Sequence, residues 1–365
     1  MLSNDSGVQY YPRSMPIDYV KQFLFSIQHE FAGGILLDTS YVYTGGRNLN
    51  FQTNIDQPLP SQFGNTCVNS YIVPNCAGPV PQYTSISAAL YDGWSNYNAL
   101  QVRVQKQMSY GLNFQVNYAW SKSLDTGTGG GHGSGVDIYQ NAYSPAANYG
   151  LSTFNAAHTL AGEVVYELPF GSRRQFALHG PLDEIVGGWR VSSSFQWRTG
   201  VPFTPVIQGN IANQLDPGLT LALSNGTTMY PVLVGNPKVS NPTNSQWFNP
   251  AAYADPAPGT FGDNVRGTLI GPGLTLVNLS IAKEFPLHFE GVKLEIRADA
   301  YNAFNHTNYG NPDANVGWTC ANMALPCGST TAGATLADGT AGTVTNPAGF
   351  NANRRIIQLG ARFSF

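Results

Sequence analysis

The stretch "YNALQVRVQKQMSYGLNFQVNYAWS" (residues 97–121) contains two runs of alternating side chains joined by a short connection. In the second run, Gly111–Ser121, apolar residues occupy the even positions from Leu112 to Trp120, and mostly polar residues lie between them. Alternation with a period of two is typical of a β-strand whose two faces meet different surroundings. The connection "QMSYG" therefore predicts an antiparallel hairpin at residues 97–121.

The same alternation recurs along the chain and predicts nine strands. Their ranges are Tyr19–His29, Gly34–Tyr43, Tyr97–Lys106, Gly111–Ser121, His158–Leu168, Trp189–Thr199, Leu274–Phe285, Val292–Tyr301 and Arg354–Phe365. Each range is about ten residues long, which is the length that a tilted strand needs to cross a bilayer. Only 11% of the residues are charged and 12% are aromatic, a composition that suits a sheet in contact with lipid.

The connections between these strands alternate between short and long. The short ones lie at residues 30–33, 107–110, 169–188 and 286–291, and the long ones at 44–96, 122–157, 200–273 and 302–354. Outer-membrane barrels have this rhythm because one rim carries tight periplasmic turns and the other carries large extracellular loops. A soluble antiparallel sheet with one hydrated face would show the same side-chain alternation, but not the alternating loop lengths.

Charged side chains indicate where each face of the predicted sheet points. In Val292–Tyr301, every odd position from 293 to 299 is charged. A lysine or arginine that faces lipid at mid-depth costs about 2–4 kcal/mol, whereas one that faces a watery lumen costs little. The sequence therefore predicts an all-β, antiparallel transmembrane barrel with an apolar outer face and a charged wall along its lumen. The residues of this wall are Glu163, Glu167, Lys293, Glu295, Arg297 and Asp299.

Several other classes of protein fit the sequence poorly. No apolar run approaches the roughly 20 residues of a transmembrane helix. The net charge of −3 and the lack of a basic cluster give no indication of a nucleic-acid partner. The segment "DTGTGGGHGSG" (125–135) lacks the Lys-Ser/Thr of a phosphate-binding loop. We expect no cofactor.

An enzyme is also disfavoured by the sequence. Ser192 and Ser194 share the polar face of one predicted strand, and His158 begins another, but no motif fixes a base beside a nucleophile. Aromatic residues of the long loops, such as Trp247 and Tyr253, are instead candidates to bind a polar ligand or glycan.

The four cysteines form two close pairs, Cys67/Cys76 and Cys320/Cys327, each within a long loop. Pairs with this spacing in extracellular loops favour local disulfides that stiffen the loops. Other pairings, free thiols and a zinc site remain open as alternatives, although neither pair has the CxxC spacing typical of zinc ligands.

Several phrases of the sequence resemble the TonB-dependent transporter family, and within it the Oar-like barrels that carry a carboxypeptidase-regulatory-like N-terminal domain. The phrases are "FSIQHEFAGGILLDTSYVYTGGRNL" (25–49), "SNYNALQVRVQKQMSYGLNFQVNYAWSKSLD" (95–125), "VVYELPFG" (164–171), "GGWRVSSSFQWRTGVPFT" (187–204), "FNPAAYADPAPGTFGDNVRGTLIGPG" (248–273), "ADAYNAFNHTNYGNP" (298–312) and "RRIIQLGARFSF" (354–365). The resemblance implies a 22-stranded outer-membrane barrel with a plug domain in its lumen. It also implies uptake of an unknown solute, driven by the TonB complex of the inner membrane.

Parts of that family's architecture are absent from these 365 residues. The sequence shows no secretory signal, no TonB box, no plug and no first half of the barrel, so we expect residues 1–365 to be the C-terminal part of a larger barrel. The last strand ends on Phe363 and Phe365, which resemble the signal that the barrel-assembly machinery reads.

Two alternatives come from other classes of protein. One is a stand-alone outer-membrane barrel that acts as an adhesin or a passive pore, with an additional strand near Pro202–Ile207 or Leu219–Leu223. The other is a soluble carbohydrate-binding β-protein.

Overall fold

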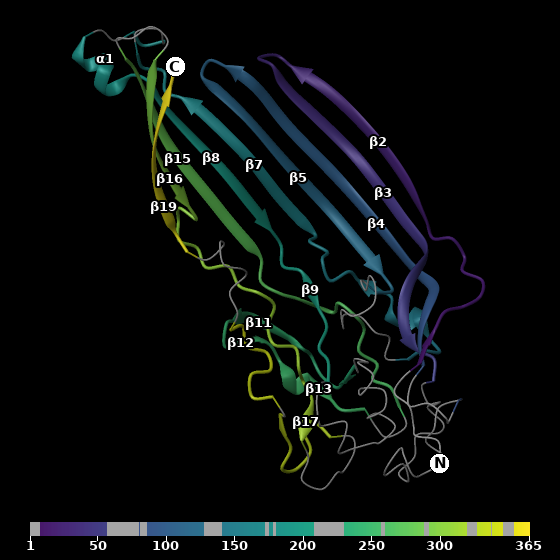
Figure 1. The fold of residues 1–365 in the computed structure, drawn as a ribbon. Coiled ribbons are helices and arrows are strands. Elements are labelled where there is room, and N and C mark those ends of the chain that lie inside the picture. The colour runs from purple at the N-terminus through teal and green to yellow at the C-terminus, as the bar shows by residue number, and fades with distance from the viewer. Residues whose placement is uncertain are drawn as a thin grey trace.

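Nine long strands form one antiparallel sheet, and each strand pairs with the next along the chain (Figure 1). This computed structural model describes residues 8–56, 80, 86–127, 141–171, 175–177, 180–207, 230–256, 260–287, 292–319, 327–336, 338–345 and 354–365. The nine strands are β2 (Tyr19–Phe31), β3 (Ile35–Asn54), β4 (Ile86–Ser109), β5 (Leu112–Asp125), β7 (His158–Glu167), β8 (Trp189–Arg198), β15 (Leu274–Pro286), β16 (Lys293–Tyr301) and β19 (Ile356–Ser364). All nine predicted segments are confirmed as strands of an all-β fold.

Strands β3 and β4 are longer than the sequence pattern predicts. Alternation stops at the Thr-Gly-Gly-Arg-Asn segment that begins at Thr44, yet the pairing of β3 with β4 continues past it. A bulge absorbs the irregularity at Asn48, whose φ is 56°. Beyond the bulge, Phe51 and Ala88 are buried, and β1 (Val8–Tyr10) pairs in parallel with the start of β4. Both described ends of the expected long connection at 44–96, residues 44–54 and 86–96, therefore continue the hairpin.

The turn between β4 and β5 follows from its two central residues. Ser109 pairs with Leu112, which leaves Tyr110 and Gly111 as the turn. Both have positive φ values, 51° and 80°, as a type I′ turn requires. This turn matches the right-handed twist of the flanking strands.

The connection between β7 and β8 is a folded element rather than a tight turn. It contains the short helix α1 (Pro181–Val186) and a bridge between Phe170 and Phe176. In the described part of the chain, no helix is long and apolar enough to cross a membrane.

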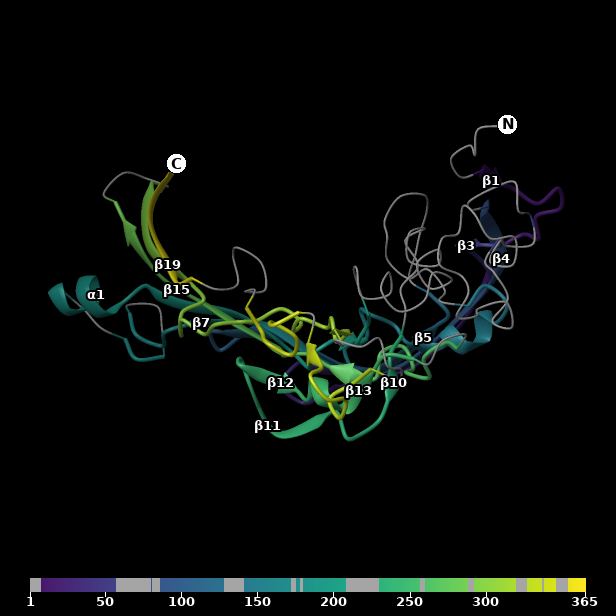
Figure 2. The same cartoon turned by 90° about the horizontal axis from the view of Figure 1, so that it is seen from below.

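Two chemically different faces run the length of the sheet. On one face the register aligns Phe114 with Val164, and Val191 with Ile281. On the other it aligns Glu167 with Arg190. Figure 2 shows that the sheet curves into a trough, with α1 outside the wall formed by β15 and β19. Because Lys283 on the apolar face bonds to α1, the apolar face is the convex one and the polar face is concave.

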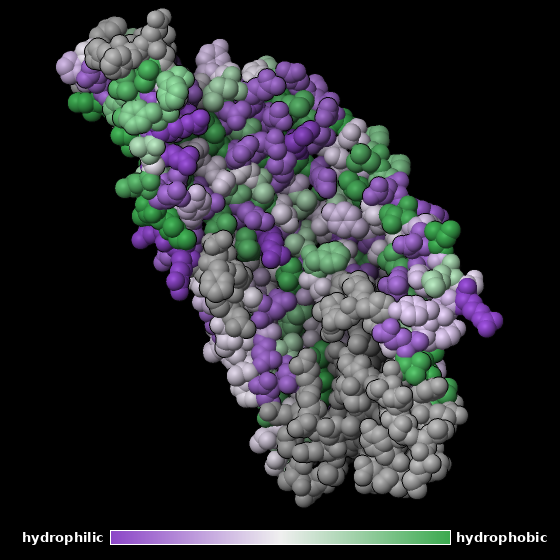
Figure 3. Space-filling view, in the orientation of Figure 1, coloured by the Kyte–Doolittle hydropathy of each residue, from purple (hydrophilic) through white to green (hydrophobic). Residues whose placement is uncertain are grey.

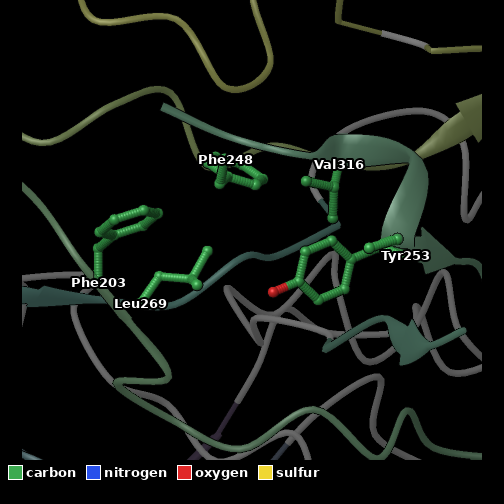
Figure 4. Close-up of a cluster of buried hydrophobic side chains, with 6 residues drawn as sticks. Phe203, Phe248, Tyr253, Leu269 and Val316 are labelled. Atoms are coloured by element: carbon green, nitrogen blue, oxygen red, sulfur yellow. The ribbon is translucent and has the colours of Figure 1, made fainter. Parts of the chain in front are cut away.

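The long connections fold into a cap at one end of the strands (Figure 1). Its short strands are β6 (Gly150–Leu151), β9 (Pro202–Phe203), β10 (Val232–Leu233), β11 (Lys238–Thr243), β12 (Gln246–Phe248), β13 (Tyr253–Ala254), β14 (Leu269–Ile270), β17 (Trp318–Thr319) and β18 (Thr335–Leu336), with 3-10 turns at Pro145–Asn148 and Pro250–Ala252. Figure 4 shows the apolar cluster that holds the cap together. Its buried residues are Phe203, Phe248, Ala252, Tyr253, Leu269 and Val316.

The two edges of the sheet have no neighbour among the described residues. Strand β2 pairs only with β3, and β19 only with β16. Every residue of β2 is exposed, and on β19 Leu359 is 78% exposed. The additional strand expected near Pro202–Ile207 does not join this sheet, because β9 pairs with β14 inside the cap. The other expected position, Leu219–Leu223, lies outside the described residues.

Candidate functional site

The predicted charged wall lies on the concave face, where Glu295 and Lys293 take part in ion pairs that join β16 to β8 and β15. Arg190 of β8 donates to Glu295 Oε2 over 2.5 Å and lies 3.5 Å from a carboxylate oxygen of Glu284. Lys293 is also 3.5 Å from Glu284. Glu284 and Glu295 are direct cross-strand partners, so the two cations offset a like-charge pair. Figure 3 shows hydrophilic residues spread over the strands of this face.

A hollow of about 300 Å³ lies on the same face between β7, β8, β15 and β16. Glu163 and Asp299 line it on opposite sides. Asp299 accepts a hydrogen bond of 2.6 Å from Ser280 and lies 3.2 Å from Arg297 Nε. The other polar residues that line the hollow are Ser192, Ser193, Ser194, Asn278, Ser280 and Tyr301. The hollow thus combines two carboxylates with hydroxyl and amide groups, a chemistry suited to polar contact with a solute or with another protein segment.

All six predicted wall residues are on this face, but they do not form one cluster. Glu295, Lys293, Arg297 and Asp299 share one face of β16, whereas Glu163 and Glu167 lie on β7, with β15 and β8 between the two strands. The sequence prediction missed the partners that complete the network. These are Arg190 and Glu284, together with a separate pair 2.9 Å apart, Asp38 and Arg103. Assigning the odd or the even positions of every predicted strand to the polar face, rather than those of two strands alone, would have identified these four residues.

The residues that the sequence offered as hydrolase candidates, Ser192, Ser194 and His158, are not brought together. Ser192 and Ser194 face the concave hollow, whereas His158 lies on the convex face, where its Nδ1 is 2.8 Å from the hydroxyl of Tyr118. A sheet therefore separates the serine hydroxyls from this imidazole. In the described part of the chain, no three His, Cys, Asp or Glu side chains are grouped to hold a metal ion.

A buried arginine joins two of the long connections inside the cap. Arg266 is 2% exposed, and its guanidinium donates to the backbone oxygen of Asp125 over 2.8 Å and to the Asp125 carboxylate. Its Nε donates to the backbone oxygen of Asn148 over 3.2 Å. Asn148 in turn accepts a bond of 2.6 Å from the Tyr230 hydroxyl. We call these four residues the loop clamp. Sequence reasoning missed the clamp, although Arg266 lies in one of the phrases that carry the family resemblance.

Two asparagines of another such phrase fix the loop end of β15 and β16. Asn308 is 1% exposed, and its side-chain amide exchanges two hydrogen bonds with the backbone of Thr275, at 2.7 and 2.9 Å. Asn302 bonds in the same way to the backbone of His306. These side chains replace backbone partners where the strands separate.

The aromatic loop residues that were candidates for ligand binding contribute to packing. Tyr253 is fully buried in the apolar cluster, and burial raises the pKa of its hydroxyl to about 12. Trp247 packs against the same cluster and donates from its indole to the Ile270 backbone oxygen over 2.8 Å.

Asp255 is a buried acid in the cap, and its surroundings disfavour the charged carboxylate. It is 3% exposed, and one carboxylate oxygen accepts a long bond of 3.3 Å from the Trp318 backbone. The other oxygen has no hydrogen-bond partner in the described structure. Burial raises the pKa of Asp255 to about 7.

Cys327 is disulfide-bonded and fully buried beside Trp318. The other three cysteines, Cys67, Cys76 and Cys320, lie outside the described residues, so the expected pairing within each loop stays a prediction.

The solved structures to which this chain is similar include two from bacteria. One is FpvA of P. aeruginosa in complex with a pyoverdine and iron, at 11% identity and a TM-score of 0.42, covering 94% of this chain and 27% of that chain. The other is the FrpB iron transporter of Neisseria meningitidis, at 9% identity and a TM-score of 0.42, covering 97% of this chain and 32% of that chain. This chain thus spans less than a third of the length of either protein.

No curated protein sequence matches the chain. The family described as "Outer membrane beta barrel domain" matches residues 2–358, which is nearly the whole sequence. The match agrees with a sheet of bilayer-spanning strands that is apolar on its convex face and charged on its concave face. The chain belongs to the outer membrane beta barrel domain family, and its place is the outer membrane.

Proposed function

We propose that this chain is the C-terminal part of the barrel of an Oar-like, TonB-dependent transporter, and that the whole protein takes up a solute across the outer membrane. One observation carries the proposal. The nine strands form a trough with a charged concave face and two edges that have no partner strand among the described residues, which is the form expected of part of a wide barrel. The family phrases listed above, which occur in both strands and loops, support the same assignment.

The directions of the edge strands support a larger barrel. Eight successive antiparallel pairings separate β2 from β19, so these two strands run in the same direction. If they closed on each other, the junction would be parallel, and single-chain bacterial barrels close with antiparallel pairs and an even number of strands. An odd number of additional strands makes every junction antiparallel. A barrel of about 22 strands would supply about thirteen.

In that barrel the concave face borders the lumen, and the charged wall faces the plug or the passing solute. Arg190 and Lys293 balance Glu284 and Glu295, so the wall presents oriented charges without a large net charge. The hollow beside Glu163 and Asp299 offers polar contacts to a neighbouring group. Coupling to the TonB complex would depend on parts of the transporter beyond this chain, and β19 would engage the barrel-assembly machinery through Phe363 and Phe365.

The size and pore behaviour of the native protein test this proposal. We expect peptides of this sequence, recovered from the native outer membrane, to come from a polypeptide that is much larger than 39.2 kDa and contains a plug. We expect the isolated 365-residue chain to give no steady conductance in planar bilayers. A native 39.2 kDa product with stable single-channel conductance would instead identify a stand-alone pore.

A further inference from the structure

A lysine on the membrane-facing side of β15 is covered by the connection between β7 and β8. Lys283 pairs with Trp189 in the register and shares the convex face with Ile281, yet its exposed fraction is only 5%. Its ammonium donates to the backbone oxygens of Glu184, Ile185 and Gly187 over 2.5, 2.7 and 3.1 Å. It also lies 5.2 Å from the ring centre of Trp189 and 5.0 Å from that of Phe285.

These bonds fix the end of α1 to the convex face. The carbonyl groups at the end of a helix have no partner within the helix, and a cation offsets their partial negative charge. The Trp189 indole adds a bond of 2.9 Å to the Ile185 backbone oxygen. Figures 1 and 2 accordingly place α1 at the turn end of the strands and outside the wall of the trough.

The connection also exposes large apolar side chains on its own surface. Ile185 is 67% exposed and Phe176 is 52% exposed. The Phe176 ring is stacked on Phe170 at 5.7 Å, and its backbone donates to Pro169 over 2.8 Å, so this part of the connection is folded. Ile185 adjoins the apolar face at Trp189, whose indole donates to the Ile185 backbone oxygen. Trp189 and Tyr166 are the apolar-face residues nearest this end of β8 and β7.

A second lysine indicates that the turn end of the strands lies at the boundary between lipid and water. Lys106 lies on the convex face of β4, close to the turn, and its ammonium donates to the Gly33 backbone oxygen over 2.6 Å and to the Ser109 hydroxyl over 2.7 Å. Lysines on lipid-facing surfaces occur at helix or strand ends, where the aliphatic stem stays in lipid and the charge reaches polar groups.

We propose that the described residues of this connection, 169–171, 175–177 and 180–187, form an interfacial foot that lies in the headgroup region of the periplasmic leaflet and contacts phospholipid through Ile185 and Phe176. The partner is lipid because the exposed apolar surface continues the membrane-facing side of the barrel. Apolar side chains that rest at the headgroup boundary gain binding energy from the area they remove from water. Lys283 holds the foot against the barrel, so α1 cannot turn into the periplasm.

Photocrosslinking tests this proposal in intact outer membranes. A benzophenone amino acid would replace Ile185, with Ile281 on the membrane-facing side as the lipid-exposed control and Ser240 in β11 of the cap as the water-exposed control. Phospholipid adducts would be measured by mass spectrometry. All three positions are exposed at the surface, so the substitutions leave the fold intact.

We expect the yield of phospholipid adducts at position 185 to approach that at position 281 and to exceed that at position 240 at least about tenfold. A yield at position 185 equal to that at position 240 would overturn the proposal. Adducts of position 185 with a periplasmic protein in place of lipid would also overturn it.

Discussion

Removing the arginine of the loop clamp tests whether the long connections form one packed cap. In the variant Arg266→Met, the Asp125 carboxylate keeps its buried position, 6% exposed, and loses its ion-pair partner. Removing one member of a buried pair typically costs about 3–5 kcal/mol, because the remaining charge is uncompensated. The Asn148 carbonyl loses a hydrogen bond as well.

This free-energy cost predicts how much faster the backbone amides near the clamp exchange hydrogen with solvent. Each 1.4 kcal/mol is about a factor of ten, so the clamp region should open about a hundred to a few thousand times more often. We expect backbone amides of residues 144–152 to exchange hydrogen faster by that factor in mass-spectrometric measurements. The strands β5 and β7 should keep their protection. The matched control is Val265→Ala, since Val265 is the neighbouring residue and is 48% exposed.

A double-mutant cycle separates the ion pair from a general loosening of the cap. Asp125→Asn alone should also destabilise the clamp, because it replaces the charged partner of the buried Arg266 guanidinium with a neutral amide. Combining Asp125→Asn with Arg266→Met should cost less than the sum of the two single changes, by about 0.5–3 kcal/mol. Unchanged exchange of residues 144–152 in Arg266→Met would refute the reasoning.

Three further predictions concern other parts of the chain. Asp255 has a raised pKa in the folded cap, so its ionisation weakens the cap as the pH rises from about 4 to about 7, by up to roughly 4 kcal/mol. Asp255→Asn should therefore raise the thermal unfolding temperature of the cap at pH 8 and leave it nearly unchanged at pH 4; equal effects at both pH values would contradict the burial of this charge. Val116→Arg should destabilise insertion into lipid vesicles by about 2–4 kcal/mol, whereas Asn117→Arg, one residue away on the concave face, should cost about 1 kcal/mol or less. Deleting Phe365, which is fully exposed at the end of β19, should leave the sheet intact but lower the amount of chain assembled in the outer membrane. An unchanged amount of assembled chain would show that Phe365 is not part of an assembly signal.

The sequence predicted the nine strands well because alternation is a local property of the chain. Phe114 and Gln115, for example, can be assigned to opposite faces of the sheet from their own positions, without knowledge of their distant partners. The same parity placed the six wall residues on one face. It did not identify their partners, because the bond from Arg190 to Glu295 joins residues 105 positions apart.

The cap was not predictable from periodicity. Arg266 and Asp125 are 141 positions apart, and the segments around them have no alternating pattern. The extension of β3 was missed for another reason, since Gly45 and Gly46 interrupt the side-chain pattern without ending the backbone pairing. Burial of Tyr253 and Trp247 likewise depends on packing between two long connections, so their aromatic character alone suggested ligand binding.

The opposite chemistry of the two faces is tested most directly by spin labels at four consecutive positions of β5. Labels would replace Phe114, Gln115, Val116 and Asn117 one at a time in membrane-inserted protein, and their collision rates with oxygen and with a water-soluble nickel complex would be measured. Oxygen dissolves in the hydrocarbon, so we expect its collision rate to peak at positions 114 and 116, and the nickel collision rate to peak at 115 and 117. A reversed phase, or no alternation between the four positions, would contradict a convex face in lipid and a concave face in water.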